Sequence, residues 1–154
     1  MKLSVKKGVS FGLTSGIITT LGLIVGLFSN TRSSAVIISG ILVIAIADAM
    51  SDALGIHVSQ ESEKSNTEKE VWESTIATFL SKFFIALSFV LPILFLPLNI
   101  AVVACILWGI FLLVTFNYYI AKQKNVSPMG MVFEHLAIAI VVIIVTYYVG
   151  EILK

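Results

Sequence analysis

The sequence predicts an all-α fold, a polytopic membrane protein whose five transmembrane helices form one domain over residues 1–154. Composition is the first observation, because 58% of the residues are hydrophobic and only 12% are charged. A soluble domain carries about 25% charged residues, so this chain has too few to cover a water-facing surface. The second observation is the presence of five apolar segments, each near the roughly 20 residues that cross a bilayer core as a helix.

The first span is expected over residues 8–28. The basic stretch Met1–Lys7 precedes it, as in a secretory signal, but the apolar run continues to about Phe28 and is too long for a signal core. The other spans are the apolar runs between polar or proline-containing connections, over residues 35–57, 72–96, 99–121 and 130–153. Pro92 and Pro97 mark the end of the third span, because proline bends or ends a helix.

Lysine and arginine residues collect on the cytoplasmic side of membrane proteins, and here they divide unevenly. One side of a five-helix path receives Lys2, Lys6, Lys7, Lys64, Lys69, Lys122 and Lys124. The other side receives only Arg32 and Lys154. We therefore expect a multi-pass protein of the cell membrane, with the N-terminus and the loop 58–71 in the cytoplasm and the C-terminus outside.

Four charged residues fall inside the expected spans, namely Asp48, Asp52, Lys82 and Glu134. A charge at the centre of a membrane helix costs about 2.5–3.5 kcal/mol on the translocon scale, so these side chains are expected to face inward. Asp48 and Lys82 lie at matching depths on neighbouring helices, which predicts an ion pair between them.

Polar residues of the other helices lie in the same inner half of the bundle. Glu134 falls at a depth close to that of Asp52, and Ser15 and Asn117 fall in the same inner half, whereas the outer half is almost wholly apolar. This asymmetry predicts a polar cavity that opens to the cytoplasm.

Asp48 and Asp52 are four residues apart and share one helix face. Two carboxylates with hydroxyl groups nearby suit hard divalent ions such as Mg²⁺, Mn²⁺ or Fe²⁺, and they also suit a proton relay. The alternative is a purely structural Asp48–Lys82 pair with Asp52 hydrated at the membrane edge.

His57 and Glu61, one helical turn apart, form a candidate pair at the mouth of such a path. A solvated helix end is the alternative for this pair. The acidic loop 58–71 would concentrate cations at that mouth, or it is simply a charged loop in water.

A stripe of small residues runs along the first span and includes Gly8, Gly12, Gly22 and Gly26. Such stripes let helix backbones approach closely. We expect this stripe to form the interface of a homodimer, and packing within one chain is the alternative.

Two segments resemble the vacuolar iron transporter family. GLTSGIITTLGLIVGLFSN, from Gly12 to Asn30, is similar to the family's first helix, and ISGILVIAIADAMSDALGIHVSQESE, from Ile38 to Glu63, is similar to its second. The resemblance implies a five-helix fold and export of divalent metal from the cytoplasm. It also implies that the metal path lies at a dimer interface.

The chain departs from the family pattern at positions that line this path. The family's first-helix Asp is Ser15 here, its second-helix Met is Asp52, and its Glu is Ile56. The short loop 58–71 stands where plant and fungal members carry a Glu-rich metal-binding domain.

The sequence therefore favours a homodimeric transporter of divalent cations, Fe²⁺ or Mn²⁺, embedded in the lipid bilayer. Asp48, Asp52, Glu134, Ser15 and Asn117 would line the ion path, with Lys82 as the counter-charge. No prosthetic group and no nucleic-acid partner are expected, and no nucleophile elbow or phosphate loop indicates an enzyme. The alternative function is a non-transporting module that assembles with a membrane partner and whose intramembrane charges serve only packing.

Overall fold

The computed structural model describes residues 2–154, in which every regular element is a helix. The helices are α1 Leu3–Thr31, α2 Ser34–Glu61, α3 Glu68–Ser88, α4 Val90–Phe95, α5 Leu98–Gln123 and α6 Pro128–Ile152. Five spans are long and apolar enough to cross a membrane, because α3 and α4 together form one span over Glu68–Phe95. The predicted five-helix membrane fold is confirmed, and the largest difference in a boundary is the start of α1 at Leu3 rather than Gly8.

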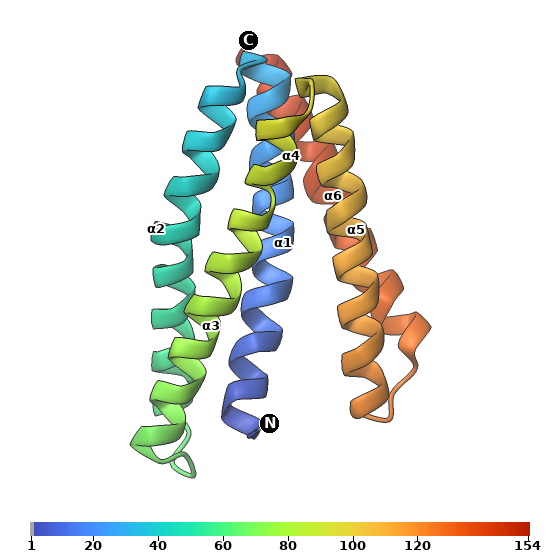
Figure 1. Cartoon of the computed structure of the whole chain (residues 1–154). Helices are drawn as coiled ribbons and strands as arrows, with labels where there is room; N and C mark the ends of the chain where they lie inside the picture. The colour runs from blue at the N-terminus through green and yellow to red at the C-terminus, as the bar shows by residue number, and fades with distance from the viewer. Residues whose placement is uncertain (1) are drawn as a thin grey trace.

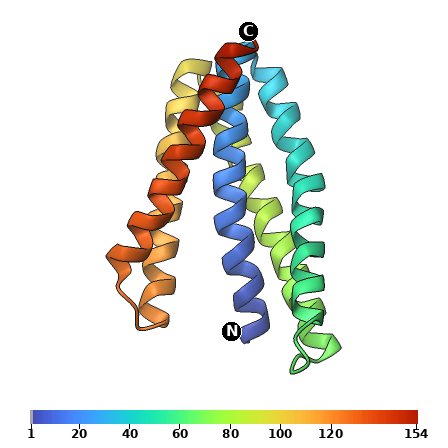
Figure 2. The same ribbon diagram turned by 180° about the vertical axis from the view of Figure 1, so that it is seen from behind.

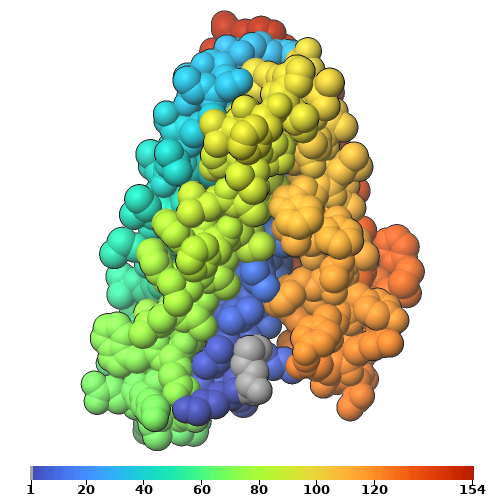
Figure 3. All heavy atoms as spheres, viewed as in Figure 1, coloured from blue at the N-terminus to red at the C-terminus, as the bar shows by residue number. Residues whose placement is uncertain are grey.

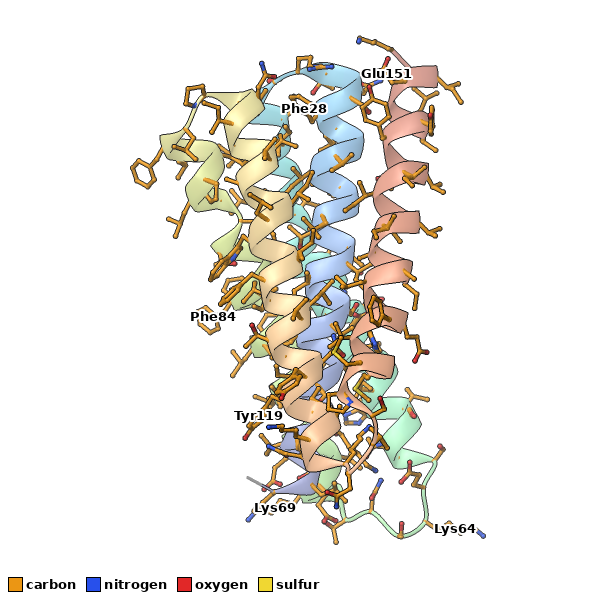
Figure 4. The ribbon with its side chains drawn as sticks, turned by 90° about the vertical axis from the view of Figure 1, so that its right-hand side faces the viewer. Phe28, Lys64, Lys69, Phe84, Tyr119 and Glu151 are labelled. Carbon is orange, nitrogen blue, oxygen red and sulfur yellow. The ribbon has the colours of Figure 1, made fainter. Side chains whose placement is uncertain are left out.

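The two termini lie at opposite ends of the bundle, as an odd number of spans requires (Figure 1). The N-terminus shares its end with the α2–α3 and α5–α6 connections (Figure 2). Lys64 and Lys69 lie at this same end, opposite Glu151 (Figure 4). That the lysine-rich end faces the cytoplasm stays a prediction from the distribution of positive charge.

α1 occupies the centre of the bundle and packs against α2, α3, α5 and α6. α2 packs against α1, α3 and α4, whereas α5 packs against α1, α4 and α6. α1 therefore separates an α2–α3 side from an α5–α6 side (Figure 1). Large apolar side chains cover the outside, and Phe84, which is 64% exposed, projects away from the helices as a lipid-facing residue would (Figure 4).

The third span is interrupted between α3 and α4 at Phe89. Pro92 has no backbone N–H, and its ring crowds the carbonyl four residues earlier. That carbonyl belongs to Ser88, the last residue of α3. The Ser88 hydroxyl accepts a hydrogen bond from Trp108 Nε1 on α5 at 3.1 Å, which ties the break to the neighbouring helix.

The N-terminal half of α1 lies against α3 through glycine. A Cβ added at Gly12 would stand 2.5 Å from the Thr78 carbonyl oxygen, and one at Gly8 would lie 2.9 Å from Ala77 Cβ. The Thr78 hydroxyl also approaches the Gly8 carbonyl oxygen at 3.3 Å. The two backbones are thus in close contact because neither glycine has a side chain.

The C-terminal half of α1 lies against α6 in the same way. A Cβ at Gly22 would stand 2.8 Å from Val142 Cγ1, and a Cβ at Gly26 would stand 3.3 Å from the Thr146 carbonyl oxygen. Ser29 Oγ adds a hydrogen bond to the Tyr147 carbonyl oxygen at 3.0 Å.

The four glycines predicted to form a dimer interface are therefore used inside one chain, which corrects that assignment. Gly8 and Gly12 bring α1 onto α3, and Gly22 and Gly26 bring α1 onto α6. Packing within the chain, the alternative weighed from the sequence, is the one observed. A homodimer stays a prediction, but it needs a surface other than this stripe.

We expect Gly12→Ala to destabilise the protein by about 1–3 kcal/mol, because the added methyl group overpacks the α1–α3 contact. Gly55→Ala is the matched control, since a Cβ there meets nothing within 4 Å and Ala is the better helix former. Thermal unfolding in mild detergent measures both. An equal change in the two variants would contradict the close α1–α3 packing.

Candidate ion site

Lys82 is the most unusual side chain of the bundle, because it lies about halfway along the third span and is only 1% exposed. An ammonium group at this depth must be neutralised by neighbouring groups. The structure supplies two carboxylates from α2 and one hydroxyl from α1.

Both carboxylates of α2 contact the Lys82 ammonium. Lys82 Nζ donates a short hydrogen bond to Asp52 Oδ2 and lies 2.6 Å from Asp48 Oδ2. The Asp48 contact is an ion pair whose angle falls outside a hydrogen bond. The predicted Asp48–Lys82 pair is thus confirmed, and Asp52 joins it because residues four apart share a helix face.

Ser15 completes the cluster from α1. Its hydroxyl donates to Asp52 Oδ2 at 2.6 Å and accepts from Lys82 Nζ at 3.0 Å. Gly16, the next residue, lets α1 approach this part of α3, since a Cβ there would lie 3.1 Å from Lys82 Cγ. We call these four residues, Ser15, Asp48, Asp52 and Lys82, the ion cluster.

The ion cluster contains two carboxylates and one ammonium group, so its formal charge is −1 when all three are ionised. The Asp48 and Asp52 side chains are 32% and 22% exposed, whereas that of Lys82 is 2% exposed. Part of each aspartate side chain therefore remains accessible beyond its contact with the ammonium. An oxygen-rich, negatively charged site of this kind suits a hard cation.

Glu134 and Asn117 do not join this cluster, which corrects their predicted place on a shared path. They belong to α6 and α5, on the other side of α1 from α2. Glu134 is exposed, and Asn117 is buried with its Nδ2 donating to the Leu113 carbonyl oxygen at 2.9 Å. Counting residues along a helix predicts the depth of a side chain in the bundle. It does not predict on which side of α1 that side chain lies.

His57 and Glu61 are also not brought together as an ion-binding pair. Thr75 Oγ1 already donates to the Val71 carbonyl oxygen, so His57 Nδ1 donates to Thr75 Oγ1 at 3.0 Å. The His57 ring also packs edge-on against Trp72, with centroids 4.8 Å apart. His57 thus joins α2 to α3, and Glu61 is exposed at the end of α2.

Part of the negative charge at the lysine-rich end is already paired. Lys2 Nζ lies 2.5 Å from Glu73 Oε1, and Lys7 Nζ lies 3.4 Å from Glu63 Oε2. These pairs join the start of α1 and the residue before it to the α2–α3 connection and to the beginning of α3. They favour the charged-loop alternative over a strongly acidic mouth.

Within residues 2–154, no group of three or more His, Cys, Asp or Glu side chains is arranged to hold a metal ion. The two Asp carboxylates with the Ser15 hydroxyl are the oxygen set that the fold brings together at membrane depth. Sequence reasoning missed the Asp52–Lys82 contact. The spacing of four between Asp48 and Asp52 was the signal that both could reach the same lysine.

We expect Lys82→Met to destabilise the protein by about 3 kcal/mol, because it leaves two partly buried carboxylates without their counter-charge. Lys69→Met, on the same helix but exposed, should change stability by less than about 0.5 kcal/mol. Chemical unfolding in mixed micelles compares the two. Equal stability of both variants would show that the ammonium is not needed for folding.

Residues 6–71 match the model of the VIT family, a segment that holds most of α1, all of α2 and the start of α3. A search of curated proteins gave no match. Ser15, Asp48 and Asp52 lie inside the matched segment, whereas Lys82 lies beyond it. Members of this family transport metal ions across a membrane and are not enzymes. Residues 6–71 of this five-helix membrane protein, less than half of its 154 residues, are similar to the VIT family.

Proposed function

We propose that this chain carries divalent metal cations, Fe²⁺ or Mn²⁺, out of the cytoplasm. The observation that carries the proposal is the meeting of Ser15 from α1 with Asp48 and Asp52 from α2 around Lys82, near the middle of these packed helices, where the three oxygen-bearing residues lie within the segment that matches the VIT family. Carboxylates at this depth are costly, and in membrane proteins such residues commonly mark ion pathways.

The Lys82 ammonium acts in this proposal as an internal cation that holds the site when no metal is bound. An arriving M²⁺ ion competes with it for Asp48 Oδ2 and Asp52 Oδ2, the two oxygens that the ammonium contacts. Binding therefore requires the ammonium to withdraw, and release of the metal lets it return. Such an exchange keeps the carboxylates neutralised at each stage, which avoids the cost of a bare charge in the membrane.

Coupling to protons is a further part of this proposal. A proton on either carboxylate removes one negative charge and weakens the site for M²⁺. Metal release toward an acidic compartment is thereby favoured over release toward a neutral one. The homodimer and the cell-membrane location remain parts of this proposal.

The test is metal flux into liposomes that contain purified protein and a trapped fluorescent chelator. We expect Fe²⁺ or Mn²⁺ entry well above that of empty liposomes. Asp48→Asn and Asp52→Asn should each slow entry by about tenfold or more, the equivalent of losing 1.4 kcal/mol of binding to the ion. Glu134→Gln is the matched control, because this exposed carboxylate lies on the far side of α1 and should leave flux unchanged.

Two outcomes would contradict the proposal. If Asp48→Asn and Asp52→Asn transport like the parent, the ion cluster is not the path. If the parent protein moves no divalent ion above background, the chain is not a transporter by itself, and the assembly-module alternative is favoured. An imposed pH gradient that leaves the parent's flux unchanged would remove only the proton-coupled part.

A further inference from the structure

A second polar region lies on the opposite side of α1 from the ion cluster. A cavity of about 620 Å³ opens at the lysine-rich end, between α1 and the α5–α6 pair. In the ribbon views α5 and α6 diverge from α1 toward this end (Figure 2). The space-filling view shows the N-terminal half of α1 at the surface between α3 and α5, beside this hollow (Figure 3).

The charged side chains that line the cavity are all basic. Its polar wall includes Lys6, Lys7, Thr14, Asn117, Lys124 and His135, and no Asp or Glu side chain lines it. Lys7 is partly neutralised, since its ammonium lies 3.1 Å from Gln60 Oε1 and 3.4 Å from Glu63 Oε2. Lys6 and Lys124 form no ion pair with any residue of the described chain, 2–154. The cavity is therefore a positively charged site that favours an anion.

The inner part of the cavity offers neutral hydrogen-bonding groups. Asn117 is 1% exposed and uses one amide hydrogen on the Leu113 carbonyl oxygen at 2.9 Å. His135 Nδ1 donates to the Met131 carbonyl oxygen at 2.8 Å, because a carbonyl can only accept. With this proton on Nδ1, the neutral ring offers only the lone pair of Nε2, which accepts a hydrogen bond and cannot donate to an anion. The second amide hydrogen of Asn117 therefore remains as a neutral donor for the oxygen atoms of an anion beyond the lysines.

The remaining wall is apolar and consists of Leu3, Phe11, Ile120 and Met131. A free inorganic anion gains nothing from such a surface. A phospholipid with an anionic headgroup would place its phosphate among the lysines and the start of its acyl chains against this wall. The cavity also lies at the end predicted to face the cytoplasm, the side on which anionic lipids attract basic residues.

We propose that the cavity between α1, α5 and α6 binds the phosphate headgroup of an anionic phospholipid, with Lys6 and Lys124 as its principal charged contacts. The bound lipid would fill the space between the diverging helices and fix α5–α6 relative to α1. This inference does not depend on the ion that the protein carries, because no member of the ion cluster lines the cavity.

Native mass spectrometry of the purified full chain tests the proposal, with phosphatidylglycerol and phosphatidylcholine added at equal concentrations. We expect phosphatidylglycerol to be retained at least about tenfold more strongly, because the basic residues of the cavity attract its anionic headgroup. The variant Lys6→Gln with Lys124→Gln should abolish this preference. The matched control is Lys64→Gln with Lys69→Gln, which removes the same charge from the same end but outside the cavity and should keep the preference.

Three results would overturn the proposal. Equal retention of the two lipids by the parent would exclude recognition of the anionic headgroup. Equal loss of preference in the cavity variant and the control would assign the effect to net charge alone. Inorganic phosphate at millimolar concentration that saturates the cavity and displaces phosphatidylglycerol would assign the site to a free anion instead of a lipid.

Discussion

A single buried ammonium group constrains the arrangement of the first three spans. Lys82 lies halfway along its span, and because it is only 1% exposed, water cannot hydrate its ammonium group. Only neighbouring helices can neutralise it, so α2 must present its aspartates and α1 its serine at the same height. The close approach of α1 to α3 through glycine makes this meeting possible. Packing and charge neutralisation therefore determine the same geometry on the α2–α3 side.

The polar groups on the two sides of α1 carry net charges of opposite sign. On the α2–α3 side, two carboxylates surround one ammonium group, and the excess charge is negative. On the α5–α6 side, lysines gather around a cavity with no acidic residue in its wall. α1 thus separates a site suited to a cation from a site suited to an anion. The separation follows from the central position of α1, whose small residues admit a helix on each side.

The sequence was sufficient to predict the membrane class, the five spans and the Asp48–Lys82 pair. These predictions depend on hydrophobic length and on depth along a helix, and both can be counted along the chain. It was not sufficient to predict which polar residues share a side of the bundle. Glu134 and Asn117 match the ion cluster in depth, but the position of α5 and α6 around α1 depends on packing between distant segments.

The glycine stripe and His57 show a similar limit. Glycine spacing reveals that a helix packs closely against a neighbour, but it does not reveal whether the neighbour is in the same chain. The spacing of one helical turn pairs His57 with Glu61, whereas the contacts that His57 makes are with Thr75 and Trp72 of another helix. The spacing of residues along a helix shows which of them share a face, but it does not show which other helix packs against that face.

The most direct measurement of the central claim is a double-mutant cycle between Lys82 and Asp52. It compares the free energy of unfolding of the parent, of Lys82→Met, of Asp52→Asn and of the double variant in one lipid–detergent mixture. Residues in one ionic network should show an interaction energy of about 1–3 kcal/mol, so the double variant should lose less stability than the sum of the single losses. Losses that add within about 0.3–0.5 kcal/mol would show that the ammonium and the carboxylate are energetically independent, which would contradict the account.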